Sequence, residues 1–277
     1  MKISRTEIIS HEKIDPRMRI RPNPKEVERA AKLLVEAKSP LMIVGDELYN
    51  AKAVDKAVKL AELIGMPVTQ VRQVFCNFPE SHNLWVGTIA GRGVESLTFP
   101  KDVDVVINVG NKLQHGSPAP IVPRSVKFID LRNDSWSMGN VITTEAPLVA
   151  DVGYGLDDLI AAVQGIMTAM IKAKAQERAE EVRKFTEQAK TLRAQIVKNP
   201  DWNERPLLAD RLTYEVAQFA DKDAIIVHEA GSIGLHSFTS IPSVGGNCSS
   251  TMARISAPAS APRPESSSRV PTSRLFA

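Results

Sequence analysis

Glycine, amide and acidic residues stand at the ends of three short apolar runs, as Gly45-Asp46, Gly110-Asn111 and Asp130. If these runs are parallel strands, the residues meet beyond the carboxyl ends of the strands, where open α/β sheets bind their ligands. The chemistry indicated is non-covalent binding of a ligand. Roles in turns and helix caps are the alternative for the same residues.

Other reactive residue types are scattered. Gly91-Arg92-Gly93 neither follows a clear strand nor completes the Gly-x-Gly-x-x-Gly fingerprint of dinucleotide sites. Cys76 and Cys248 lie far apart and form no Cys-x-x-Cys pair. Carboxylates, histidines and cysteines do not cluster, so the sequence predicts no metal site.

Helices and buried strands alternate over residues 23–165. Asn23 and Pro24 are suited to start a helix, and Gly65 is suited to end a second one. A wholly apolar run, as is typical of a strand that is buried on both faces, occurs at 40–45. Further strand-like runs that are mostly apolar follow at 66–71, 103–109, 126–130 and 147–150. The pattern predicts a doubly wound parallel sheet covered by helices.

The flanking segments differ from this pattern. Residues 1–22 read as a linker or arm, and residues 166–204 as a charged helical linker that is solvated or bridges two domains. Residues 205–246 resemble the start of a second, truncated α/β domain. Residues 247–277 are rich in Ser, Ala, Pro and Arg and are expected to be disordered.

Composition excludes several functional classes. The 277 residues are 43% hydrophobic and 24% charged, with a formal net charge of +3. Basic and acidic residues are mixed, which argues against nucleic acid as a partner. No apolar stretch is long enough to span a membrane or to serve as a signal peptide, so we expect a cytoplasmic protein.

The order of segments resembles the central domain of thiamine-diphosphate-dependent enzymes of the acetolactate synthase, benzoylformate decarboxylase and pyruvate decarboxylase type. No single segment is specific by itself. The resemblance depends on the order and spacing of all the segments along the chain. The matching segments are 37–45, 61–68, 78–87, 102–110, 128–130 and 149–151, with a further match from 206 to about 246.

The resemblance implies thiamine diphosphate and Mg²⁺ as cofactors of intact relatives, which cleave or form carbon–carbon bonds beside the carbonyl of 2-oxo acids. Such enzymes use a glutamate from a pyrimidine-binding domain and a Gly-Asp-Gly motif for Mg²⁺. This sequence contains no Gly-Asp-Gly and no counterpart of the first domain. We therefore expect a fragment that is inactive alone, has no catalytic residue and binds neither cofactor by itself.

Two sets of residues carry the cofactor hypotheses that the resemblance implies. Glu229, Gly231 and Ser232 match the turn that approaches the cofactor diphosphate, where hydroxyls and backbone N–H groups can meet phosphate oxygens. In relatives that carry FAD, the position of Asp130 lies near the adenosine, and Gly110 ends the neighbouring strand. An exposed loop without ligand is the alternative for the first set.

Single histidines and tryptophans are expected to have structural roles. His82 is interpreted as a packing or capping residue, and His115 as a surface loop residue. Trp85 and Trp136 could line a pocket, but aromatic side chains in apolar surroundings are usually core.

Three readings of the whole chain stay open. It is an incomplete thiamine-diphosphate enzyme, a free-standing nucleotide-binding or FAD-binding α/β module, or a non-catalytic subunit of a full-length paralogue. Intact relatives are oligomers, so a homo-oligomer is also expected. A frameshift near residue 246, which would leave an out-of-frame tail, is a further hypothesis that the gene's nucleotide sequence can test.

Overall fold

The computed structural model describes residues 20–71, 75, 77–89, 94, 97–113, 122–140, 142–208, 211–212 and 214–215. Six parallel strands form one sheet in the order β3-β2-β1-β4-β5-β6. The strands are β1 (Pro40–Val44), β2 (Val68–Gln70), β3 (Trp85–Thr88), β4 (Val105–Val109), β5 (Lys127–Arg132) and β6 (Ala146–Val149). The predicted parallel α/β fold is confirmed.

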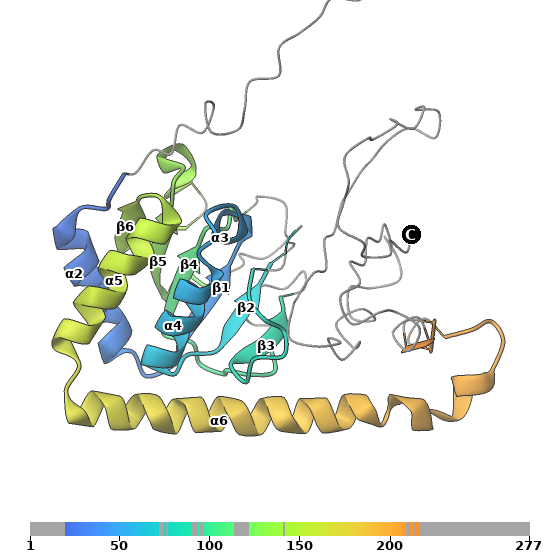
Figure 1. Ribbon diagram of the computed structural model, residues 1–277. Helices are drawn as coiled ribbons and strands as arrows, with labels where there is room; N and C mark the ends of the chain where they lie inside the picture. Colours follow the sequence, from blue (N-terminus) through green and yellow to red (C-terminus); the bar gives the residue numbers. More distant parts are fainter. Residues whose placement is uncertain are drawn as a thin grey trace, which may run out of the picture.

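Helices cover one face of the sheet (Figure 1). They are α2 (Pro24–Glu36), α4 (Val54–Ile64) and α5 (Val152–Ile166), and the short α3 (Asp46–Asn50) follows β1 directly. The Asn23 side chain caps α2 by accepting a hydrogen bond from the Lys25 N–H, as its position predicted. Gly65 ends α4 in the left-handed conformation, with φ of 69°.

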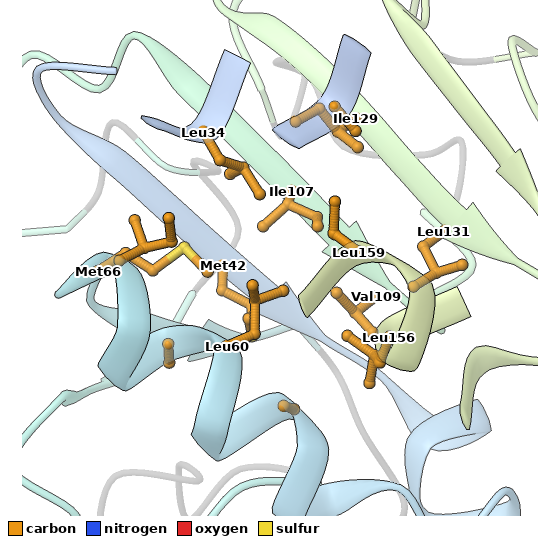
Figure 2. Packing of buried hydrophobic residues seen from close by; sticks show 14 of the residues in the cluster. Leu34, Met42, Leu60, Met66, Ile107, Val109, Ile129, Leu131, Leu156 and Leu159 are labelled. Carbon is orange, nitrogen blue, oxygen red and sulfur yellow. The ribbon is translucent and has the colours of Figure 1, made fainter. Parts of the chain in front are cut away.

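Alternate residues of the strands build two separate cores. Met42, Ile107 and Ile129 lie side by side on the helix-covered face, and Figure 2 shows them packed beneath Leu60 and Leu159. Leu41, Val106 and Phe128 form the core of the opposite face. Because both faces are buried, β1 and most of β4 have apolar side chains on both sides, which is why their sequences indicated strands.

The opposite face is covered by connecting segments. The buried residues there include Ile89, Val94, Val122 and Ile142, all outside strands and α-helices. In the described part of these connections, helical structure is limited to the short 3₁₀ helix η2 (Ser135–Ser137) and to the single 3₁₀ residue Val94. The helical layer is therefore concentrated on one face in the described residues.

A long helix, α6 (Ala169–Ala194), crosses below the sheet in Figure 1. Its charged sequence gave no indication of packing, but Ala175, Val182 and Thr186 are buried against the domain. Arg178 donates hydrogen bonds to the carbonyls of Ile64 and Ala37, the residues at the carboxyl ends of α4 and α2. A cation is favourable there because both helix ends carry partial negative charge.

The final described segments are short. After α6, the turns η3 (Ile196–Lys198) and η4 (Pro200–Asn203) follow, and residues 209–210, 213 and 216–277 lie outside the description. The second α/β domain expected at 205–246 and the tail at 247–277 fall almost entirely there. None of the described helices is long and apolar enough to cross a membrane.

Candidate functional site: the strand ends at the switch point

The strand order changes direction between β1 and β4. The chain leaves β1 toward β2 on one side, and leaves β4 toward β5 on the other. In open α/β sheets the crevice at such a point, beyond the carboxyl ends of the strands, is the usual ligand site. The sequence-predicted positions Gly45-Asp46 and Gly110-Asn111 come together here, because β1 and β4 are direct neighbours.

Two glycines allow the loops after β1 and β4 to pack on each other. A Cβ at Gly45 would lie 2.3 Å from the Gly110 carbonyl oxygen and 2.3 Å from the Asn111 Cα. Gly110 has φ of 68°, and a Cβ there would lie 2.8 Å from the Glu47 Cβ. The glycines thus serve a contact of backbone with backbone across the switch point.

A buried polar network lies at the carboxyl ends of β4 and β5, on the face opposite the helices. Asn108 and Asp130 are register partners, and the Asn108 Nδ2 donates to the Asp130 Oδ1 at 2.8 Å. Arg132, two residues along the same strand, donates from Nη2 to the Asp130 Oδ2 at 2.8 Å. Both side chains of this ion pair are buried: the Arg132 side chain is 5% exposed and the Asp130 side chain 3%. Both carboxylate oxygens of Asp130 are therefore engaged by protein donors.

The network continues into the turn after β5. Arg132 Nη1 donates to the Ser137 Oγ at 2.9 Å, and this hydroxyl donates to the Asp134 Oδ2 at 2.7 Å. Asp134 also accepts from the Trp136 N–H. Arg132 therefore connects the end of β5 to the turn that holds Trp136.

Acidic residues of α3 tie further loops to the same edge. The Asp46 Oδ1 accepts hydrogen bonds from the Phe75 N–H and the Asn77 Nδ2. The Glu47 Oε2 accepts from the Asn133 N–H at 2.9 Å. Acids at the carboxyl ends of parallel strands are typical ligand-binding residues. Here the two carboxylates bind neighbouring loops and hold them in place.

Burial dominates the electrostatics of the two most enclosed acids. Burial raises the pKa of Asp130, and the hydrogen bond from Asn108 and the charge of Arg132 offset this effect only in part. Burial likewise raises the pKa of Glu47 above its ordinary value of 4.5, against the lowering effects of the Asn133 N–H and Arg132. Asp134, on the turn after β5, has a lowered pKa because the Ser137 hydroxyl donates a hydrogen bond to its carboxylate.

The raised pKa of Glu47 predicts a pH-dependent effect of Glu47→Gln. A carboxyl whose folded-state pKa is raised stabilises the fold fully below its unfolded value of 4.5, and loses this contribution as the pH rises through the folded-state pKa. Gln keeps an oxygen for the Asn133 N–H but does not titrate. We expect the variant's free energy of unfolding, relative to the parent, to increase as the pH rises above 4.5 in urea titrations.

Glu180→Gln is the matched control for this experiment. Glu180 accepts hydrogen bonds from Arg183, which lower its pKa, so its contribution is present at higher pH and lost as the pH falls. The relative stability of this variant should change in the opposite direction. A Glu47→Gln difference that stays constant or falls with rising pH contradicts the assignment.

Three buried polar atoms of this network have no hydrogen-bond partner among the residues that the structure describes. They are the Asn108 Oδ1, the Asn111 Nδ2 and the Arg132 Nε. Asn108 is fixed in orientation, because its Nδ2 donates to both the Asp130 Oδ1 and the Asn111 carbonyl. Such atoms are usually satisfied by ordered water or a bound group of similar size.

The described residues do not fit the cofactors that the sequence led us to consider. Mg²⁺ with a diphosphate requires several oxygen ligands that converge on one point. Asp46, Glu47 and Asp130 each accept hydrogen bonds from protein groups. Asp130 is also closed to the hydroxyls of an adenosine, because Asn108 and Arg132 hold its two oxygens. In the part of the chain that the structure describes, no group of three or more His, Cys, Asp or Glu side chains could hold a metal ion.

Some of the site residues predicted from the sequence lie at this edge of the sheet, and others lie outside the described residues. Gly110 and Asp130 lie at the switch point, whereas Glu229, Gly231 and Ser232 lie outside the described residues, as do His115 and both cysteines. The sequence did not single out Asn108, Arg132 and Glu47. The signal was present for Arg132, since residues two apart in a strand share a face and a buried arginine requires an acidic partner.

Interpretations of single aromatic and histidine residues were partly right. His82 has the expected capping and packing role: its Nδ1 accepts from the Leu84 N–H and its ring meets Phe78 edge-on. Trp85 is buried as expected. The core role expected for Trp136 is wrong, because its side chain is 89% exposed on the turn η2.

Comparisons with known proteins agree with this fold. Residues 27–159 match the family described as thiamine pyrophosphate enzyme, central domain. The sulfoacetaldehyde acetyltransferase of Castellaniella defragrans is 29% identical over 158 residues, which is 54% of this chain and 26% of that protein. The acetolactate synthase large subunit of Corynebacterium glutamicum is 27% identical over 198 residues, or 70% of this chain and 30% of that protein.

A solved structure shows the same fold. The benzoylformate decarboxylase of Polynucleobacter necessarius superposes with a TM-score of 0.62 at 16% identity, covering 91% of this chain and 43% of that chain. This chain thus spans less than a third of the two curated relatives and less than half of the solved one. Residues 27–159 are thus similar to the central domain of the thiamine pyrophosphate enzyme family, and the fold of the solved relative agrees with that match.

Proposed function

We propose that these residues provide the central domain of a thiamine-diphosphate-dependent enzyme that acts on 2-oxo acids, and that this chain does not catalyse the reaction by itself. The observation that carries the proposal is the engagement of the strand-end acids. The Asp130 carboxylate is paired with Arg132 and Asn108, and Glu47 holds the loop at Asn133. These groups fix the domain's loops instead of offering oxygens to a cofactor.

The domain's contribution is then positional. Thiamine diphosphate supplies the carbanion chemistry when it is bound, and the protein must bind and orient it. In the described residues, α6 is held on the domain by Arg178 and by Thr186, whose Oγ1 donates to the Asn83 carbonyl. This contact supports a role for residues 166–204 as a fixed connection from the central domain, at 23–165, to the chain at 205–246.

Turnover by the purified chain tests the proposal. Pyruvate and benzoylformate are incubated with the protein, thiamine diphosphate and Mg²⁺, and released CO₂ is measured. The benzoylformate decarboxylase of Polynucleobacter necessarius, assayed in parallel, shows that the conditions allow turnover. We expect the chain to give the rate of the protein-free blank. A rate clearly above the blank that requires both cofactors contradicts the proposal.

Association with a full-length relative is a separate consequence. A positional domain acts only as part of a larger assembly, formed with further copies or with a longer paralogue. Co-purification of the tagged chain with such a paralogue supports this arrangement. Sedimentation of the purified chain as a monomer in the presence of the paralogue argues against it.

A further inference from the structure

The switch-point crevice has the position of a nucleotide site but differs from one in its polar groups. A nucleotide held at the end of a parallel sheet needs an acidic residue whose oxygens accept hydrogen bonds from the ribose hydroxyls. It also needs backbone that the ligand can approach, which glycines usually provide. Asp130, Gly45 and Gly110 occupy the corresponding positions on β5, β1 and β4.

Both oxygens of this acid are engaged by protein donors, and the residue is buried. The Asn108 Nδ2 lies 2.8 Å from one oxygen of Asp130, and the Arg132 Nη2 lies 2.8 Å from the other. The residue is 2% exposed and Arg132 is 4% exposed. A ribose hydroxyl could reach this carboxylate only after the guanidinium had left. Removing one partner of a buried ion pair is strongly unfavourable, and a single hydrogen bond to a hydroxyl returns less than it costs.

The glycines are also committed to the fold. A Cβ at Gly45 would overlap the Gly110 carbonyl and the Asn111 backbone, and a Cβ at Gly110 would overlap Glu47. Their lack of side chains therefore serves the packing of one loop against the other. No approach of a ligand is needed to explain them.

We infer that this chain's own Arg132 closes the switch-point crevice, so that the domain holds neither FAD nor an adenine nucleotide there. The guanidinium satisfies the acid that a ribose would otherwise satisfy, and through Ser137 it is connected to the turn at Asp134–Trp136 that follows β5. The Asn108 Oδ1, Asn111 Nδ2 and Arg132 Nε, which have no hydrogen-bond partner among the described residues, are buried, so an external nucleotide does not reach them. This inference is independent of whether the chain catalyses a reaction.

Titration of the parent protein with FAD and with ADP is the first test. Binding is followed by calorimetry and by the melting temperature, with each ligand raised to about 1 mM, the concentration at which binding of roughly −4 kcal/mol half-saturates a site. We expect no saturable heat and no rise in melting temperature, because a ligand that binds the folded state raises its stability. Saturable binding of either ligand overturns the inference.

Chemical rescue is the second test and gives a positive signal. Arg132→Ala should leave a cavity whose wall includes Asp130 and Ser137, which the small cation methylguanidinium can enter. We expect methylguanidinium at millimolar concentration to raise the melting temperature of this variant and not that of the parent. Arg183→Ala is the control, because Arg183 pairs with Glu180 on the exposed side of α6. An equal response of both variants overturns the inference, and the parent titration remains decisive should Arg132→Ala not fold.

Discussion

Gly65→Ala is expected to lower the free energy of unfolding by about 2–5 kcal/mol, the sum of two separate effects. Gly65 has φ of 69°, a left-handed conformation that costs an alanine roughly 1–2 kcal/mol. The new Cβ would also lie 1.9 Å from the Ala175 carbonyl oxygen of α6. Since this neighbour is backbone, α6 must move away, and overpacking of this kind costs about 1–3 kcal/mol.

Gly139→Ala separates these effects. Gly139 has φ of 77°, but a Cβ there would meet no atom within 4 Å. This variant should lose only the conformational part, about 1–2 kcal/mol. Urea unfolding of both variants and hydrogen exchange of the α6 amides measure the difference. Equal losses in the two variants, with unchanged protection of α6, would show that the helix does not pack on Gly65.

Arg132→Met is expected to lower the free energy of unfolding by about 3–5 kcal/mol at neutral pH. The substitution keeps most of the side-chain volume but leaves the Asp130 carboxylate buried with Asn108 as its remaining donor. The double variant Asp130→Asn with Arg132→Met removes both charges, and it should recover most of the loss, because an uncharged pair carries a smaller desolvation cost. The double-mutant cycle gives the coupling energy.

The pH dependence of Arg132→Met identifies the cause. Burial already raises the pKa of Asp130, and without Arg132 nothing charged nearby on β5 opposes that rise. The protonated acid fits a buried site, so the penalty of the substitution should be smallest near or below the ordinary value of 3.8 and should grow as the pH rises through the folded-state pKa. A penalty that does not vary with pH would attribute the loss to packing instead of charge.

The sequence predicted the elements that obey local rules. The helix after Asn23 begins with a capping residue and a proline, and its apolar positions Val27, Ala30 and Leu34 are buried as their spacing indicates. The strand at Pro40–Val44 is apolar throughout because both of its faces are covered. Strand β3 was not recognised, since it is an edge strand in which only Trp85 is fully buried.

The site required information that no single segment contains. Asp130 was selected because it ends an apolar run, but its partner Asn108 lies on a different strand and is brought beside it by the register of β4 and β5. The packing of α6 was equally hidden, because Ala175 and Thr186 are small residues within a charged sequence. Local pattern therefore located the crevice, and only the tertiary arrangement showed that Arg132 closes it.

Calorimetric titration of the purified chain with thiamine diphosphate in the presence of Mg²⁺ tests the central claim most directly. The strand-end carboxylates are committed to protein donors, so we expect no heat of binding beyond dilution and no change in melting temperature. A saturable heat that depends on Mg²⁺, with a matching rise in melting temperature, would show that this polypeptide holds the cofactor by itself and would contradict the account.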